Sequence, residues 1–235
     1  MPTLFRPGLL ALAVAIPVLA CAPAGPNTTA GTGSAATAGA EADPDVRAIG
    51  ATGLPAGYLG RADRADASLA DARYASSGNG WEITTGPAHI LYSPLHTATG
   101  SYTVSTTIEQ LERPRHPEAF GVFIGGRNLD GPSQEYTYFL VRGTGEMFAQ
   151  HRMGDQLRRL IAWHRSQWVP EADAEGRATY RLQVQVRPDS VRFRVNDVVA
   201  AALPNTPELS TDGIVGLRIN HNLRVRATPV TITRP

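Results

Sequence analysis

Alternating apolar and polar residues recur along the chain from about residue 53 to the C-terminus. The clearest run is Ala178–Val186, where Tyr180, Leu182 and Val184 share one side and Thr, Arg and Gln residues take the other. A period of two residues is typical of a β-strand that buries one face. No segment keeps a convincing helical period. The pattern therefore predicts an all-β fold.

Turn-forming residues divide this pattern into many short strands. Two prolines between residues 113 and 117 exclude a strand there, and Asn196-Asp197 supplies the chemistry of a reversal. The segment from Asp63 to Tyr74 stays ambiguous, because its alanines fit a helical turn but its apolar positions are too few for an amphipathic helix. Short strands at regular spacing predict a two-sheet antiparallel sandwich or a barrel. The strands are expected at Trp81–Thr84, Ala88–Tyr92, Tyr102–Leu111, within 119–142, and at Glu146–Arg152, Leu157–Ala162, Ala178–Val186, Val191–Val195, Val198–Leu203, Gly213–Ile219 and Leu223–Ile232.

The stretch Ala119–Arg142 is predicted to form two strands of the sheet system, joined by a turn. An Asn, an Asp, a Gly and a Pro between residues 128 and 132 provide the turn. In the second strand, Tyr136, Tyr138 and Arg142 lie on one face, and apolar residues lie on the other. Two phenols and a guanidinium are an unusual set for a face that only meets solvent. The pattern therefore singles out this face as a candidate ligand surface.

The N-terminus has the layout of a secretory signal peptide over residues 1–21. Arg6 lies near the start, and the apolar run Gly8–Ile16 is too short to span a bilayer as a helix. The Val-Leu-Ala-Cys sequence that ends the segment resembles the bacterial lipobox, in which the cysteine becomes the lipid-modified first residue. Cys21 is the only cysteine in the chain, so the mature protein is expected to lack disulfides.

Residues 22–52 are rich in Ala, Gly and Thr and contain no aromatic residue, which predicts a flexible tether before a folded domain at 53–235. A cysteine, a spacer and a domain, in that order, are typical of a lipoprotein. We expect an exported protein that a lipid on Cys21 anchors to a bacterial cell membrane, at the outer membrane or facing the periplasm if the cell is Gram-negative. If Cys21 is not lipidated, the same signal predicts a secreted protein.

Charge excludes one class of partner. The formal net charge is +1, which argues against nucleic acid or an anionic membrane surface as the main partner. We expect the protein to contact a membrane only through its N-terminal lipid.

Several motifs carry a resemblance to a known superfamily. GVFIGG, YTYFLVR, YRLQVQV, VRFRVND and GIVGLRIN, in that order, resemble the concanavalin A-like lectin/glucanase jelly roll. More specifically, the order is similar to that of the bacterial branch that includes laminin-G-like and 3-keto-disaccharide-hydrolase-like domains. The resemblance covers Trp81 to Ile232. It implies two curved antiparallel sheets whose concave face often holds carbohydrate, and it indicates architecture more than activity.

A glucanase of that superfamily would carry Glu-x-Asp-x-x-Glu along one strand, which brings two carboxylates to one face. The only fragments of this pattern are Glu41-Ala-Asp43 in the tether and Glu171-Ala-Asp173 in a polar loop. No catalytic residue is therefore assigned, and the sequence favours a protein that is not an enzyme. The alternative left open is a hydrolase of carbohydrates whose carboxylates come from separate loops.

Metal binding receives no support from local motifs. The six histidines form no H-x-x-x-H or H-E-x-x-H array and have no cysteine partner. We expect no cofactor. A structural calcium needs no local motif, so it stays open.

Sugar binding needs aromatic rings and planar hydrogen-bonding groups. Suitable residues lie on strands or strand ends, and together they are the predicted ligand-binding set: Tyr136, Tyr138, Arg142, His151, Trp163, Arg218 and Asn220. We expect a lectin-like domain that binds a glycan or polysaccharide on its concave sheet without catalysis. A structural or protein-interaction module of the cell envelope is the second alternative.

Overall fold

The computed structural model describes residues 53–235 of the 235-residue chain. The predicted signal peptide, the tether and Cys21 lie outside the described residues. Within residues 53–235, two antiparallel sheets and two single 3-10 turns, η1 (Leu69–Asp71) and η2 (Pro207–Leu209), account for the regular structure. No helix in this part of the chain is long and apolar enough to cross a bilayer.

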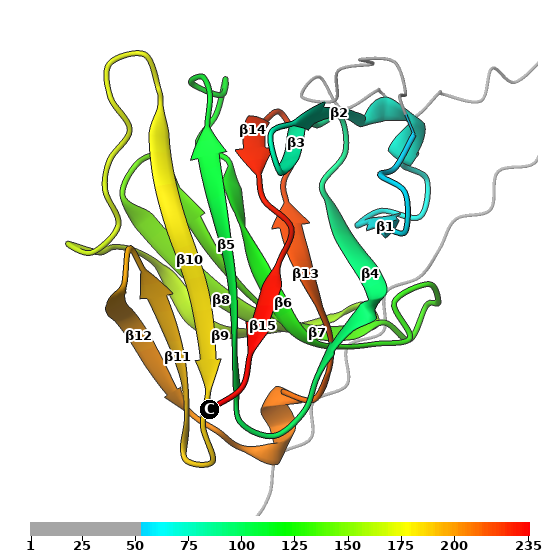
Figure 1. The fold of residues 1–235 in the computed structure, drawn as a ribbon, viewed down its shortest axis with the longest axis vertical. Helices are drawn as coiled ribbons and strands as arrows, with labels where there is room; N and C mark the ends of the chain where they lie inside the picture. The colour runs from blue at the N-terminus through cyan, green and yellow to red at the C-terminus, as the bar shows by residue number, and fades with distance from the viewer. Residues whose placement is uncertain (1–52) are drawn as a thin grey trace, which may run out of the picture. The chain divides into compact units, whose positions relative to one another are not determined.

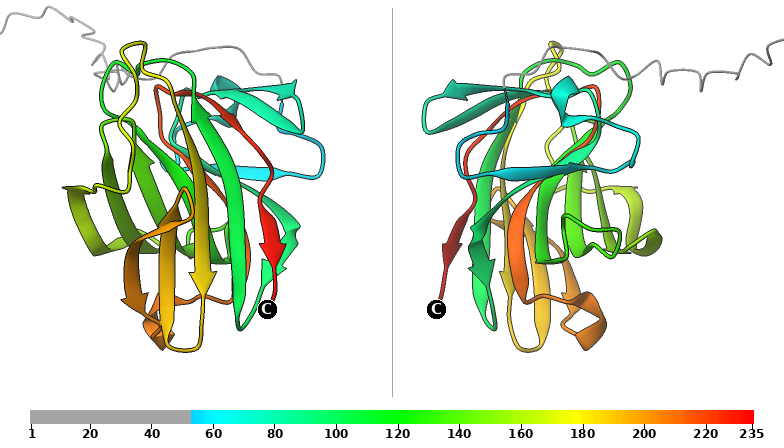
Figure 2. Two further views of the ribbon diagram at one scale, coloured as in Figure 1. Left: turned by 60° about the vertical axis from the view of Figure 1, so that its left-hand side comes forward. Right: turned by 90° about the vertical axis from the view of Figure 1, so that its right-hand side faces the viewer.

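Sheet A has seven strands in the order β1-β4-β13-β6-β7-β8-β9. Sheet B has the order β12-β11-β10-β5-β14-β3-β2, and β15 pairs with β5 beside that path. In Figure 1 the strands β5 and β10 of sheet B cross in front of β6 to β9 of sheet A, and Figure 2 shows the layers from other sides. The bounds in sheet A are β1 Leu59–Ala62, β4 His89–Ala98, β6 Ala119–Arg127, β7 Glu135–Arg142, β8 Glu146–Met153, β9 Gln156–Arg165 and β13 Gly213–Ile219. Those in sheet B are β2 Arg73–Ser77, β3 Gly80–Thr84, β5 Tyr102–Gln110, β10 Ala178–Val186, β11 Ser190–Val195, β12 Val198–Pro204, β14 Arg224–Ala227 and β15 Thr231–Thr233.

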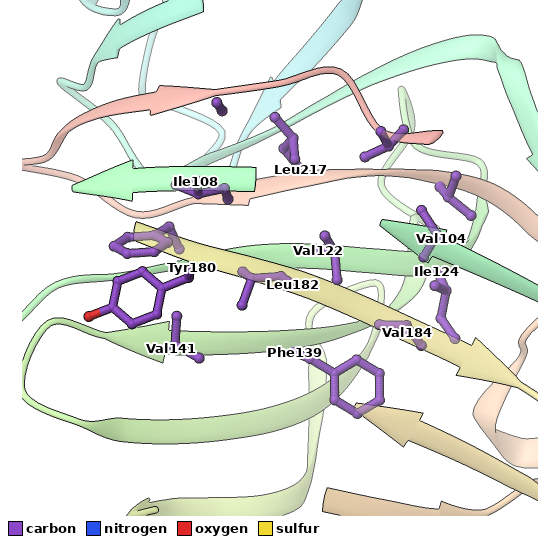
Figure 3. Packing of buried hydrophobic residues seen from close by; sticks show 14 of the residues in the cluster. Val104, Ile108, Val122, Ile124, Phe139, Val141, Tyr180, Leu182, Val184 and Leu217 are labelled. Carbon is purple, nitrogen blue, oxygen red and sulfur yellow. The ribbon is translucent and has the colours of Figure 1, made fainter. Parts of the chain in front are cut away.

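The main core lies between the two sheets. Alternate residues of β10, among them Leu182 and Val184, point inward and meet Val122 of β6 and Phe139 of β7 (Figure 3). The Phe139 ring stacks on Phe193 of β11 with 5.2 Å between centroids. The period of two residues therefore identified the buried side of these strands correctly.

Strand β7 departs from a half-buried pattern. Six of its eight residues are buried, on both faces of the strand. The side chains of Phe139 and Val141 enter the core between the sheets, whereas Tyr136, Tyr138 and Leu140 belong to a second apolar cluster. Sheet A therefore also packs apolar side chains on the side that faces away from sheet B. We call this side the outer face.

The ends of the domain differ in detail from the strands expected. Leu223–Ile232 is two strands, β14 and β15, because Pro229 has no N–H to continue the ladder between them. The ambiguous segment 63–74 holds η1 and the start of β2, and β1 precedes it as an edge strand. Strand β9 runs on to Arg165, beyond the Ala162 at which its apolar pattern stops. The expected two-sheet antiparallel sandwich is nevertheless the architecture observed.

Candidate functional site

A row of aromatic side chains crosses the outer face of sheet A. At the β9 end, the Trp163 ring stacks on Phe148 of β8 at 4.8 Å between centroids, and Phe148 lies 6.3 Å from Tyr138 of β7. Each ring has a neighbour on the next strand, so the row is continuous. It extends to β4 through centroid distances of 5.3 to 6.4 Å along Tyr138, Tyr136, Phe123 and Tyr92.

Most of the row is closed to solvent. Tyr136 is 1% exposed and Tyr138 is 7% exposed. Asp63, which follows β1, receives hydrogen bonds from both terminal nitrogens of Arg218 on β13, and Arg152 Nη1 of β8 lies 3.3 Å from the same carboxylate. Because β6 and β7 lie between β13 and β8, this link passes over the middle of the outer face. Tyr136 therefore offers almost no surface to a ligand, contrary to the role expected for it.

Arg218, Asp63 and Arg152 together form the cover over the aromatic row. The Arg218 guanidinium lies 5.4 Å from the centroid of the Tyr138 ring, and Arg218 is 5% exposed. Burial opposes the charged form of Arg218, but Asp63, Tyr136 and Tyr138 together outweigh this effect, so the pKa of the guanidinium is raised. Arg218 is therefore a charged residue held in place by Asp63, and it has little surface of its own.

The tyrosine hydroxyls on this face are firmly protonated. Burial raises the pKa of Tyr138 to about 12 and also raises the pKa of Tyr136. The Tyr138 hydroxyl donates to Oε1 of Gln150 on β8 at 2.7 Å. Tyr138 thus acts on its surroundings as a hydrogen-bond donor that fixes the Gln150 amide.

Trp163 is partly exposed, but other side chains of the protein already contact the faces of its indole ring. Phe148 stacks on the ring, and the guanidinium carbon of Arg142 lies 3.7 Å from the ring centroid. This is a close cation–π contact. A sugar ring has the indole edge available, together with the polar groups beside it, rather than an open aromatic platform.

These polar groups form the exposed end of the outer face, which we call the corner: Arg142, Glu146, Gln150, Arg159 and Trp163. Arg142 and Glu146 are direct cross-strand partners with 3.6 Å between Nη1 and Oε2. Arg159 of β9 lies directly opposite Gln150 and is exposed. The corner therefore presents one carboxylate, two guanidiniums and an amide on neighbouring strands.

His151 does not join this face. It lies opposite Thr137, whose hydroxyl donates to the Leu209 carbonyl at 2.5 Å and accepts from His151 Nδ1 at 2.8 Å. Burial lowers the pKa of His151. Because Thr137 alternates with Tyr136 and Tyr138 along β7, the imidazole points to the opposite side of the sheet. The structure separates His151 from the rest of the predicted set.

Asn220 lies at the end of β13, near the loop that precedes β6. Its Nδ2 is 3.3 Å from Oε2 of Glu118, and His221 Nε2 is 2.7 Å from Oε1 of the same carboxylate. Glu118 is 9% exposed. Asn220 therefore belongs with Glu118 and His221 at one end of the sandwich.

A cavity of about 370 Å³ opens at this end, and we call it the end pocket. It lies among the β5–β6, β7–β8 and β9–β10 connections, above Gln110 at the end of β5. Gln110 is 2% exposed, and its Nε2 donates to the Gly176 carbonyl at 2.6 Å. The charged side chains that line the pocket include Arg113, Arg115, Arg165, Glu118, Glu171 and Asp173.

Sequence patterns did not reveal the end pocket. Its residues come from three connections that are far apart in the chain, and each looks like an ordinary polar loop. The only local signal was the pair of prolines between residues 113 and 117, which predicted an irregular connection. Within residues 53–235, no group of three or more His, Cys, Asp or Glu residues is placed to hold a metal ion. A structural calcium bound by loop carboxylates and carbonyls, which the sequence left open, stays untested.

Comparison with known proteins identifies the fold. No protein-family model matches the chain, and no curated protein matches it in sequence. The structure is similar to the carbohydrate-binding module CBM66 from Bacillus subtilis, at 12% identity and a TM-score of 0.52, over 77% of this chain and 97% of that one. It is also similar to a Bacillus subtilis protein of unknown function with a galectin-like fold, at 10% identity and a TM-score of 0.53, over 75% and 89% of the two chains. At these identities the likeness shows a shared jelly-roll sandwich.

Proposed function

We propose that this domain binds a glycan without catalysis, at the corner of the outer face. The observation that carries the proposal is the corner itself, where an indole edge lies among charged and amide groups on rigid strands. The similar CBM66 structure is named as a carbohydrate-binding module, which supports a glycan as the ligand. Polar groups on strands hold their geometry better than groups on loops, which favours recognition of hydroxyls at fixed positions.

Gln150 and Arg142 are the central hydrogen-bonding groups in this proposal. Gln150 Oε1 accepts from Tyr138, so the amide nitrogen is left to donate to a sugar oxygen. Arg142 is held by the Trp163 ring and by Glu146, and its side chain is 24% exposed. Tyr138 acts as a positioning residue. A ligand would meet planar donors whose orientation is set before it arrives, which lowers the entropic cost of binding.

The proposal extends to the location of the domain. We place it on an exported lipoprotein whose Cys21 carries the lipid anchor, with residues 22–52 as the tether. This rests on the signal-peptide layout and the lipobox resemblance of the N-terminus. A module held at a bacterial surface by a tether would reach polysaccharides of the envelope or its surroundings.

A hydrolase stays the second candidate because one observation favours it. The end pocket brings Glu118 and Glu171 together from separate connections, as that alternative requires. Both carboxylates are engaged, however: Glu118 with His221 and Asn220, and Glu171 with Arg165. Release of product from any oligosaccharide, lost in Glu118→Gln, would favour this candidate over a binding module.

The experiment begins with a glycan array probed with the purified protein, followed by calorimetric titration of each hit. Gln150→Ala and Arg142→Gln should each weaken binding about tenfold, because each removes about one hydrogen bond between the protein and the sugar. Tyr138→Phe removes one hydroxyl and should weaken binding less, because Gln150 is only freed to rotate. Arg192→Gln, on strand β11 of sheet B, is the control and should bind like the wild type.

Circular dichroism at the binding temperature separates loss of ligand from loss of fold in each variant. Retained affinity in Gln150→Ala and Arg142→Gln, with both variants folded, would contradict the corner as the site. If the array yields no ligand, the structural or interaction module becomes the better interpretation.

A further inference from the structure

The end pocket adjoins the corner. Along the ends of β7, β8 and β9, Arg142 lies opposite Glu146, and Glu146 lies opposite Arg165, so the three side chains share the outer face. Arg165 also lines the end pocket, as does Thr144, whose hydroxyl donates to Glu146 at 2.7 Å. A chain lying on the corner would therefore reach the pocket with one of its ends.

The carboxylates of the pocket already have partners. Glu171 pairs with Arg165, and Glu118 pairs with His221. Asp173 Oδ1 accepts two backbone N–H groups of its own loop, from Glu175 at 3.1 Å and from Arg177 at 2.7 Å. Each of these three groups is thus already engaged within the protein.

The guanidiniums of the β5–β6 connection are not balanced in the same way. Arg113 makes one hydrogen bond, from Nη2 to the Ala174 carbonyl at 3.1 Å. Arg115 has no ion-pair or hydrogen-bond partner among residues 53–235, and it is exposed at the pocket. Arg113 and Arg115 are therefore the two guanidiniums of the pocket that no carboxylate of residues 53–235 contacts.

The floor of the pocket supplies an acceptor. Gln110 lines the cavity and is almost fully buried, and its Oε1 has no hydrogen-bond partner in the described part of the chain. A buried amide oxygen without a donor is costly, and a small shift would let it accept from a hydroxyl. The volume of about 370 Å³ is within the range of about 300–1,000 Å³ usual for small-molecule sites.

We infer that the end pocket binds the terminal acidic sugar of a glycan, a uronic acid whose carboxylate faces Arg115 and Arg113. A guanidinium recognises a carboxylate through two parallel N–H donors, which a neutral hydroxymethyl group cannot satisfy. The hydroxyls of the same ring would meet Gln110 and Thr144. This inference rests on the proposed function, because it treats the pocket as the chain-end subsite of the glycan surface.

The test uses matched pairs of disaccharides, each a uronate and its carboxyl-reduced neutral form, in the galacturonate, glucuronate and mannuronate series. Titration calorimetry of the full chain at low salt should show at least one acidic form binding about tenfold or more tighter than its neutral form. Arg115→Gln should remove most of this difference, and added salt should weaken binding of the acidic form alone. Arg192→Gln makes the same change of charge on sheet B and should keep the preference.

The outcomes separate this inference from the proposed function. If neutral disaccharides bind as tightly as the acidic ones and Arg115→Gln changes nothing, the acidic subsite is wrong while the glycan surface stands. If sulfation of the carboxyl-reduced disaccharide gives the same affinity as the uronate in every series, the site does not recognise a carboxylate and binds any negative charge. If no saccharide binds in either form, the proposed function fails as well.

Discussion

The carboxylate of Asp63 and the guanidinium of Arg218 form a two-pronged ion pair that ties the segment after β1 to strand β13. The two residues are 155 positions apart in the chain. The side chain of Arg218 is 6% exposed and that of Asp63 is 26% exposed, so most of this pair is removed from water. The pair also connects to Arg152 and therefore fastens the cover over the aromatic row.

Replacing Asp63 with Asn should destabilise the domain strongly. The change leaves the Arg218 charge buried without its partner, which typically costs about 3–5 kcal/mol. Urea unfolding followed by circular dichroism measures the loss. Asp66→Asn is the control, because Asp66 pairs with Arg64 at side-chain exposures of 65% and 67% and should change stability by less than about 1 kcal/mol. Similar losses of stability in Asp63→Asn and Asp66→Asn would contradict the role given to burial of the Asp63–Arg218 pair.

Stability should fall as the solution is acidified, through His89. Burial lowers the pKa of this fully enclosed imidazole to about 4, from an ordinary value of 6.5. Its Nδ1 donates to the Pro87 carbonyl and its Nε2 accepts from Tyr74, an arrangement that only the neutral ring satisfies. The unfolded chain takes up the proton below pH 6.5 while the folded chain resists until about pH 4, so stability is lost across that window.

The expected contribution of His89 is on the order of 3 kcal/mol between neutral pH and pH 4. Urea unfolding at a series of pH values should therefore show a smaller decline in His89→Gln, whose amide can replace both hydrogen bonds without titrating. His164→Gln controls for loss of an exposed imidazole. If His89→Gln declines as steeply as the wild type, carboxylates rather than His89 govern the acid response.

Gly176 should not tolerate a side chain. It adopts φ +82°, and a Cβ there would lie 2.3 Å from the backbone nitrogen of Arg113. Gly176→Ala would force apart the two connections that form the end pocket, at a cost of about 1–3 kcal/mol for the backbone strain alone. Thermal unfolding measures the effect. Gly131→Ala is a matched control, since its nearest neighbour would be 3.8 Å away, and an equal loss there would contradict the explanation.

The anchor predicted for the N-terminus has a direct test. Cys21→Ala should release the protein from the membrane fraction of the producing bacterium, because the thiol to be lipidated is gone. Labelling with a radioactive or clickable fatty acid should mark the wild type and not the variant. Cys21→Ser controls for the size of the side chain and should behave like Cys21→Ala. Unchanged membrane retention in both variants would argue against lipidation.

Local patterns were sufficient to predict an all-β sandwich or barrel, and the superfamily resemblance selected the sandwich. Strand β10 occupies Ala178–Val186 as its alternation indicates, and its inward residues are those chosen by the period of two. Strand ends were less accurate: β4 runs on to Ala98 past Pro94, a residue that sequence reasoning treats as a stop. Strand β1 has only four residues and buries only Ala62, so it shows no alternation to reveal it, which explains why β1 was not expected.

The site was harder to predict because alternation says which side a residue faces and not what covers that side. Tyr136 and Tyr138 share a face with Arg142, as expected, but Asp63 and Arg152 lie far from them in sequence and close over them. Trp163 and Arg142 were both predicted, yet their mutual contact, which occupies the indole, could not be read from either strand. The end pocket depends on loops alone, and no pattern specifies how loops meet.

The second apolar cluster on sheet A changes how mutational scans of this protein must be interpreted. Because β7 is buried on both of its faces, most alanine substitutions along it will lower the fraction of folded protein. A loss of apparent affinity at such positions measures folding and recognition together. Affinities therefore become comparable between variants only after each is divided by its folded fraction at the assay temperature.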